Sequence, residues 1–276
     1  MADQLLFTGE TSGERSSQRV RRSAVRSAVT SRSSIVLMTV AGLIVAALAV
    51  FQYGIAPKVL IQHYTIESDI GASQAAILSA AGLEGKQYYF KLSTQQIAAR
   101  LNAWAPVKHA TVQKVFPHGL KISLVGRKPV AMAMADVKGH EVPVAFDEDG
   151  VVFESGDAIA ALDLPVFSGI TFRDFSLGVR LPPMLIDFIR EVNQLKLSSP
   201  GLYDLISEYR IIPRSDHEFD VMVYPVHHHV AIEIGPHIDR TLCMYILRVL
   251  DVMDHDGSIS KVKEIDFRTS DVVYTR

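Results

Sequence analysis

The sequence PVKHATVQKVFPHGLKISLVGRKPV, residues 106–130, decides the fold of the region around it. Apolar and polar residues alternate on both sides of Pro117-His118-Gly119, most regularly at Leu120, Ile122 and Leu124. Alternation with a period of two, around a turn that contains proline and glycine, is typical of a β-hairpin. The sequence therefore predicts two antiparallel strands that share one apolar face.

Two short helices and a further strand are predicted before this hairpin. Residues 73–81 are rich in alanine and are followed by Gly82, which readily takes the left-handed conformation of a helix cap. Ser93 stands three residues before a glutamine, in the pattern of a capping box that opens a helix. With a first strand within residues 60–67, residues 59–129 read as β-α-α-β-β. This order predicts a two-layer α+β domain with both helices on one face of a small sheet.

Residues 130–276 carry more strand patterns, so we expect a mixed, β-rich second domain with flanking helices. Asp147-Glu148-Asp149-Gly150 separates two β-rich runs, 142–146 and 151–153, and predicts a hairpin turn. Further strands are expected at residues 206–212, 219–224, 230–234, 262–267 and 272–274. One helix opens at Pro182-Pro183. A second, over residues 237–253, has an expected apolar face made of Ile238, Leu242, Tyr245, Ile246 and Val249.

An uncharged, apolar run precedes both domains. Residues 35–56, IVLMTVAGLIVAALAVFQYGIA, would extend about 33 Å as a helix, enough to cross a hydrocarbon core of about 30 Å. Residues 1–34 hold six arginines and three acidic residues, whereas only Lys58 closely follows the run. The positive-inside rule then places residues 1–34 in the cytoplasm and the rest outside the membrane. We expect a single-pass protein of the inner membrane with a disordered basic tail.

A cleavable signal peptide is the alternative for the same run, because Ala47-Leu48-Ala49 has the A-x-A pattern of a cleavage site. The length of the leading segment and the apolar sequence that continues to Ile55 favour an uncleaved anchor. Beyond the basic tail the chain is mildly acidic, since the whole chain has 28 basic and 30 acidic residues and six arginines lie in the tail. That balance argues against a nucleic-acid partner, which needs a clustered basic face.

The sequence makes no case for catalysis, a cofactor or a metal. His227-His228-His229 would alternate between faces of a strand, and Asp147 to Asp149 do not fit the frame of a calcium loop. Ser258-Ile259-Ser260-Lys261 has the S-x-x-K spacing of penicillin-interacting enzymes, but their S-D-N and K-T-G elements are absent. Cys243 is the single cysteine and is expected to be a small buried hydrophobe. We therefore expect a non-enzymatic protein without a small-molecule substrate.

Several short sequence motifs follow one another along the chain in a recognisable order. Pro106 precedes V-x-x-A-x-V, Phe116-Pro117 precedes Leu120-Lys121-Ile122, and Arg127-Lys128-Pro129-Val130-Ala131 follows as a closing strand. Beyond them lie Asp147 to Phe153 with the pattern D-x-x-G-x-x-F, Leu164-Pro165-Val166 with Gly169, and Ile265-Asp266-Phe267-Arg268. Together these resemble the FtsQ/DivIB family of bacterial cell-division proteins, in which the membrane-proximal module is a POTRA domain. The sequence departs from the family at Gly126, where glutamate is usual, and at Thr269, where some members have an aromatic residue.

The resemblance implies a divisome scaffold at the division septum that binds small bitopic proteins similar to FtsB and FtsL and helps coordinate septal peptidoglycan synthesis. The physical route that we expect is strand addition at a sheet edge. Phe267 and Tyr274 would then be aromatic anchors, and Arg268 would pair with an acidic residue of the partner. The predicted partner-binding residues are Lys263, Ile265, Phe267, Arg268, Val272 and Tyr274. In the competing interpretation, Ile265 and Phe267 pack into the core and Arg268 caps a solvated edge.

The sequence does not exclude two other classes of protein. One is a POTRA-bearing component of envelope protein assembly or secretion, although no barrel-like series of strands follows the module here. The other is a membrane-anchored envelope enzyme, which would need a deep pocket with perturbed acidic groups.

Overall fold

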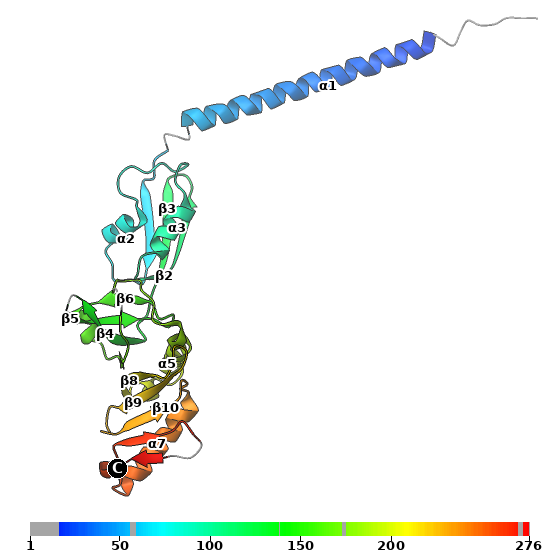
Figure 1. Cartoon of the computed structure of the whole chain (residues 1–276). Helices are drawn as coiled ribbons and strands as arrows, with labels where there is room; N and C mark the ends of the chain where they lie inside the picture. Colours follow the sequence, from blue (N-terminus) through cyan, green and yellow to red (C-terminus); the bar gives the residue numbers. More distant parts are fainter. Residues whose placement is uncertain (1–16, 56–58, 138, 173–174, 270–272, 276) are drawn as a thin grey trace, which may run out of the picture. The chain divides into compact units, whose positions relative to one another are not determined.

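The computed structural model describes residues 17–55, 59–137, 139–172, 175–269 and 273–275, of which residues 17–33 and 55 are described by their backbone alone. The chain forms two compact units (Figure 1). The first holds the N-terminal part up to Leu60 together with Tyr88–Leu92, and the second holds Ile61–Gln87 and Ser93–Arg276. Each unit is described by itself below.

The N-terminal unit is dominated by one long helix. Helix α1 runs from Ser17 to Val50 and continues as a short π-helix, η1, over Phe51–Ile55. Its residues Ser34–Gly54 are long and apolar enough to cross a membrane, and none of that stretch is buried in the protein. The predicted span 35–56 agrees with it within two residues at each end.

Helix α1 already begins at Ser17, inside the tail of residues 1–34 that the sequence predicts to be disordered. Alanine and arginine, which recur between residues 17 and 34, are favourable helix formers. A helix that is nucleated in the apolar span can also be extended one residue at a time without a new nucleation cost. Residues 1–16 lie outside the described part of the chain.

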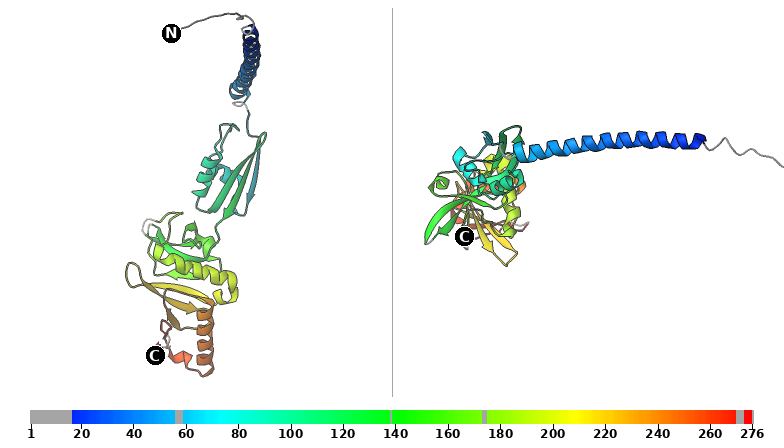
Figure 2. Two further views of the ribbon diagram at one scale, coloured as in Figure 1. Left: turned by 90° about the vertical axis from the view of Figure 1, so that its right-hand side faces the viewer. Right: turned by 90° about the horizontal axis from the view of Figure 1, so that it is seen from above.

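The second unit begins with the predicted β-α-α-β-β order, which is confirmed. Strand β3 lies in the middle of a three-stranded sheet of order β1-β3-β2, parallel to β1 and antiparallel to β2. Helices α2 and α3 lie on one face of this sheet (Figure 2). The elements are β1 (His63–Ser68), α2 (Gln74–Ala81), α3 (Thr94–Asn102), β2 (Val107–Val115) and β3 (Gly119–Gly126).

Local chemistry explains the limits of the two helices. The Ser73 hydroxyl accepts a hydrogen bond from the backbone N–H of Ala76 at 3.2 Å, and Gly82 closes α2 in the left-handed region at φ 69°. The Ser93 hydroxyl likewise accepts from the N–H of Gln96 at 3.3 Å. These caps satisfy backbone groups that the helices themselves leave unpaired.

The rest of the second unit is built on a nine-stranded sheet of order β12-β11-β10-β9-β8-β7-β4-β5-β6. The predicted strands and the hairpin turn at residues 147–150 are confirmed. The strands are β4 (Ala131–Val137), β5 (His140–Phe146), β6 (Val152–Ser155), β7 (Val166–Ser168), β8 (Ile206–Pro213), β9 (Phe219–Pro225), β10 (Ala231–Ile234), β11 (Glu264–Asp266) and β12 (Val273–Thr275).

One expectation about this region is corrected. Residues 127–131 do not close the first domain as a strand, because Ala131 begins β4 and pairs with Phe146 in the larger sheet. Val130 and Ala131 are both almost fully buried in the larger core, and hydrophobic burial rather than local pattern decides which sheet they join.

Helices α5 (Ile186–Ser198) and α7 (Arg240–His255) cover the core side of the large sheet. The rings of Phe167, Phe188 and Tyr209 stack edge-on or tilted in its centre, with centroids 5.1–5.9 Å apart. The short helices are α4 (Asp157–Ala160) and α6 (Pro200–Tyr203), with 3₁₀ turns η3 (Pro183–Leu185) and η4 (Ile259–Lys261).

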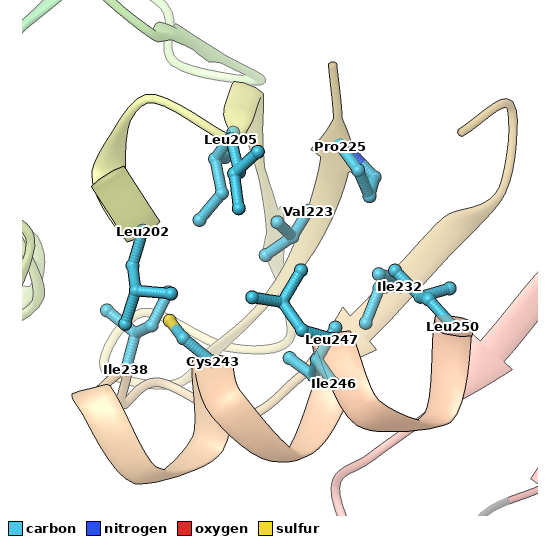
Figure 3. Close-up of a pocket in the computed structure, with 11 residues that line it drawn as sticks. Leu202, Leu205, Val223, Pro225, Ile232, Ile238, Cys243, Ile246, Leu247 and Leu250 are labelled. Atoms are coloured by element: carbon cyan, nitrogen blue, oxygen red, sulfur yellow. The ribbon is translucent and has the colours of Figure 1, made fainter. Parts of the chain in front are cut away.

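The apolar face predicted for the last helix needs one correction. Tyr245 is 46% exposed, whereas Cys243, Ile246 and Leu250 are the buried residues of α7. Between α7 and the sheet lies an apolar slot of about 30 Å³, toward which Cys243, Leu247 and Leu250 project opposite Leu202, Leu205 and Pro225 (Figure 3). A slot of this size and lining is a packing seam, because small-molecule sites usually offer about 300 Å³ or more.

Candidate protein-docking edge

Strand β12 forms one end of the nine-stranded sheet and has β11 as its single neighbour in the sheet order. Strand β11 is interior, because it pairs in parallel with β10 and antiparallel with β12. Figure 1 shows the two strands beside α7 at the C-terminal end of the chain. At this end of the sheet, β12 is therefore the strand that a partner strand can extend, whereas the sequence predicts a docking edge made by both terminal runs.

The opposite end of the sheet is covered. The N–H of Val152 in β6 donates to the carbonyl of Val179 at 2.9 Å, and the N–H of Gly178 donates to the carbonyl of Val152 at 2.7 Å. Val151 forms a β-bridge with Arg180. Natural sheets often protect an edge with a loop in this way, because an open edge is a template for pairing with another chain. Among the described residues, the two ends of this sheet thus differ in how much of the edge strand's backbone is already hydrogen-bonded.

The structure places the six predicted partner-binding residues in different environments. Ile265 is fully buried and Phe267 is 7% exposed, so both belong to the core in this state. Lys263 is exposed, while its N–H donates to the carbonyl of Thr275 and its carbonyl accepts from Ala231. Tyr274 is 51% exposed on β12, and Arg268 lies just after β11. Val272 lies outside the described residues.

Phe267 therefore cannot act as an exposed anchor without leaving the core. Its ring meets the half-exposed ring of Tyr245 edge-on, with centroids 5.6 Å apart. This contact joins α7 to the chain that follows β11, and it leaves one side of Tyr245 at the surface. By packing into the core, Ile265 and Phe267 hold β11 next to the edge strand β12.

Arg268 is held by three carboxylates at once. It makes a bidentate contact with Asp266, with nitrogen–oxygen distances of 3.0 and 2.7 Å to the two carboxylate oxygens. Its Nη1 also lies 2.9 Å from Asp220 and 3.0 Å from Glu233. The Asp266 side chain accepts a further hydrogen bond from the backbone N–H of Arg268 at 2.9 Å. The guanidinium is fixed close to β11, with its side chain 33% exposed.

Arg214 completes this group and was not foreseen from the sequence. Its Nε donates to Asp220 at 2.7 Å and its Nη2 to Glu233 at 2.9 Å, so the two arginines share two carboxylates. We call Arg214, Asp220, Glu233, Asp266 and Arg268 the arginine–carboxylate cluster. Nothing in the local sequence links residues 214 and 268, because strand pairing alone brings them together.

Two carboxylates of the cluster, Asp266 and Glu233, have pKa values shifted in opposite directions. Hydrogen bonds from Arg268 lower the pKa of Asp266, whose charged form they favour. Burial raises the pKa of Glu233, although Arg268 and Arg214 oppose that shift. With three carboxylates and two arginines, the ionised cluster has a formal charge of −1. Any acidic group of a partner must therefore compete with carboxylates that are already in place.

The described residues contain no group of three or more histidine, cysteine, aspartate or glutamate side chains arranged to hold a metal ion. Asp147, which the sequence analysis considered as part of a calcium loop, stabilises the hairpin turn. Its Oδ1 accepts hydrogen bonds from the backbone N–H groups of Asp149 and Val151. Its Oδ2 pairs with Arg127 at 2.5 Å. Cys243 is buried, and burial raises the pKa of its thiol to about 12, which makes it a poor nucleophile.

Comparison with known proteins agrees with this architecture. A family model described as POTRA domain, FtsQ-type, matches residues 61–127, which contain the three-stranded sheet and its two helices. This match confirms, over the POTRA-like domain, the resemblance to the FtsQ/DivIB family. The cell division protein FtsQ of Anaeromyxobacter sp. (strain K) is 24% identical over 198 residues, and that of Mycolicibacterium smegmatis is 37% identical over 90 residues.

These matches cover 71% and 32% of this chain. They span 64% and 26% of the two relatives' own lengths, so the chain aligns with less than two thirds of either relative. In the FtsQ-type architecture, the candidate edge lies in the β-rich region that follows the POTRA domain, outside the part matched by the family model.

Proposed function

We propose that this protein is a non-enzymatic scaffold of the bacterial divisome that presents β12 as a docking edge to bitopic division proteins similar to FtsB and FtsL. The observation that carries the proposal is that, among the described residues, β12 ends the sheet order with β11 as its neighbour, whereas β6 at the other end is covered. The FtsQ relatives support a place in cell division. Through these partners the scaffold helps to coordinate septal peptidoglycan synthesis.

Strand addition suits such an edge for a physical reason. The backbone of an incoming segment gains the hydrogen bonds of a sheet ladder, which supply affinity with little dependence on sequence. Side chains on the two faces then supply specificity. Val273 and Tyr274 are 58% and 51% exposed on β12, and such side chains can bury apolar area against a partner.

Arg268 adds a charge requirement to this edge. A partner carboxylate that approaches the arginine–carboxylate cluster can replace part of its internal pairing, because Arg268 has several donors in a fixed plane. Since the cluster is formally negative, the gain depends on geometry rather than on net charge. We therefore expect one well-placed acidic residue in the partner, not an acidic tract.

The rest of the chain fits a bitopic arrangement. The apolar stretch Ser34–Gly54 spans the inner membrane, the arginine-rich N-terminal part stays in the cytoplasm, and the two sheets lie outside. In this arrangement the FtsQ-type POTRA domain is the first module after the span in the chain, and the protein concentrates at the division septum.

Site-specific photo-crosslinking tests the docking edge directly. A benzophenone amino acid at Thr275 in the full chain is expected to capture a small bitopic division protein in living cells. The matched control carries the same probe at Glu154, in the covered strand β6. Equal capture at both positions, or capture at Glu154 alone, would contradict a docking role for β12.

Replacing Arg268 by glutamine tests the charge requirement, with Arg210→Gln as the control, because Arg210 pairs with Glu208 on β8. Arg268→Gln should reduce capture at Thr275, whereas Arg210→Gln should not. Unchanged capture would remove the role assigned to Arg268.

Depletion of the protein tests the cellular function. Long undivided filaments, with a functional fluorescent fusion concentrated at midcell, are expected. Normal division together with defective envelope protein assembly or secretion would replace the scaffold by the POTRA-bearing transport component.

A further inference from the structure

The turn at Tyr88–Leu92 has no role in the docking edge. The backbone N–H groups of Lys91 and Leu92 both donate to the carbonyl of Tyr88 at 3.1 Å, which closes the turn. Tyr88 and Phe90 are 38% and 40% exposed, whereas Tyr89 is buried. Two large rings therefore lie at the surface within three residues of each other.

This turn belongs to the same compact unit as the apolar helix. The ring of Phe90 meets the ring of Phe51 edge-on, with centroids 5.4 Å apart. Phe51 begins η1 and lies near the end of the stretch Ser34–Gly54 that can cross a membrane. The N–H of Tyr89 also donates to the carbonyl of Val59 at 2.9 Å, so the turn is bonded to the chain just past that stretch.

The side chains of the turn have the chemistry of a membrane–water boundary. Aromatic rings with an apolar body and a polar tip are enriched at the headgroup level, where tyrosine satisfies both environments. The ammonium group of Lys91 lies 5.4 Å from the centre of the Tyr88 ring. A lysine at this depth keeps its charge near lipid phosphates while its stem covers apolar surface.

We propose that Tyr88–Leu92 is a membrane-interface anchor: Tyr88 and Phe90 enter the boundary between headgroups and acyl chains, and Lys91 reaches the lipid phosphates. The proposal rests on the membrane span of the proposed function, not on a role in cell division. The occupant is the lipid bilayer, because Phe51 brings the turn to the end of the span. The anchor thereby holds the turn itself at the membrane surface.

Depth measurement by spin labelling tests the anchor. The full chain is placed in nanodiscs of phosphatidylcholine and phosphatidylglycerol, with a nitroxide at Tyr88→Cys or Phe90→Cys. The control is Leu197→Cys, at a position 71% exposed near the end of α5. The native Cys243 is buried with a raised thiol pKa, so it labels slowly. Collision rates with oxygen, which concentrates in the bilayer, and with a water-soluble nickel chelate report depth.

The ratio of oxygen to nickel collisions is expected to be several-fold higher at positions 88 and 90 than at 197. Equal ratios at all three positions would overturn the proposal. Because purified protein is used, the result does not depend on midcell localisation, and a failure of the divisome role would leave it standing.

A second measurement avoids substitutions in the turn. Wild-type protein in the same nanodiscs is exposed to a lipid whose photoreactive diazirine lies near the glycerol backbone. Adducts are expected on the peptide that contains residues 88–92 and not on the peptide around Leu197. No adducts on residues 88–92 would overturn the anchor. Protection of this turn that arises only when a division protein is added would also overturn it, in favour of a protein contact.

Discussion

Arg127 forms a buried clasp between the chain that leaves the POTRA domain and the hairpin turn of the large sheet. Its Nη1 contacts the Oδ2 of Asp147 at 2.5 Å, and the two side chains are 12% and 2% exposed. Its Nε also donates to the carbonyl of Ala105 at 3.1 Å. We predict that Arg127→Ala destabilises the protein strongly, because it leaves a buried carboxylate without its counter-charge.

The size of the effect follows from what remains around Asp147. Breaking a buried ion pair by removing one partner costs about 3–5 kcal/mol. Asp147 keeps two backbone N–H donors, from Asp149 and Val151, which places the expected loss at the lower end, about 3 kcal/mol. Lys128→Ala is the matched control, since the Lys128 side chain is 72% exposed and its 2.9 Å pair with Asp69 should contribute about 0–1 kcal/mol.

Urea unfolding of the full chain in detergent micelles measures the difference. The single tryptophan, Trp104, precedes Ala105 and so reports on the region of the clasp. With a slope of about 2 kcal/mol per molar urea, a loss of 3 kcal/mol moves the midpoint down by about 1.5 M. Adding Asp147→Asn to Arg127→Ala should recover part of the loss, because the uncompensated charge is then gone. A midpoint for Arg127→Ala equal to that of Lys128→Ala would refute this reasoning.

Three further predictions concern backbone, core and pH. Gly169→Ala should lower the midpoint of thermal unfolding far more than Gly139→Ala. Both glycines have positive φ, but a Cβ at 169 would lie 2.2 Å from a backbone carbonyl oxygen of β8, whereas a Cβ at 139 would meet nothing within 4 Å. Tyr209→Phe should leave stability unchanged or raise it by up to about 1 kcal/mol, because the buried Tyr209 hydroxyl has no hydrogen-bond partner among the described residues; a loss above that size would indicate a partner. The lowered pKa of Asp266 means that its contribution to stability is present above its unfolded pKa of about 3.9 and is lost as the pH falls through the lower folded pKa. Arg268→Gln should therefore reduce the fall in the free energy of unfolding below about pH 4. The same fall in the variant and in the wild type would contradict this role of the Asp266–Arg268 pair.

Element order was readable from the sequence wherever a local device marks it. Ser73, Gly82 and Ser93 act on backbone groups within a few residues, so their caps do not depend on the rest of the fold. The hairpin around Pro117 depends on alternation and turn chemistry of the same short range. Composition alone does not show that the helix of a neighbouring span can extend through residues 17–34.

The candidate site was only partly predictable. The terminal run was identified, but its pattern could not distinguish an edge strand from an interior one. β11 and β12 have similar β propensity, and their places follow from pairing with β10, which lies about thirty residues earlier in the chain. Phe267 and Ile265 were assigned to the edge because apolar residues suit both a core and an interface.

By itself, the sequence determined the features that arise from short-range interactions and from the bilayer as a solvent. These are the apolar span, the β-α-α-β-β order and the turn at Asp147 to Gly150. Tertiary structure alone decided which strands end the large sheet in the described part of the chain, and that Arg214 and Arg268 share their carboxylates. The physical reason is that sheet order and ion pairing are set by contacts between residues far apart in the chain, whose closure depends on the whole core rather than on any local pattern.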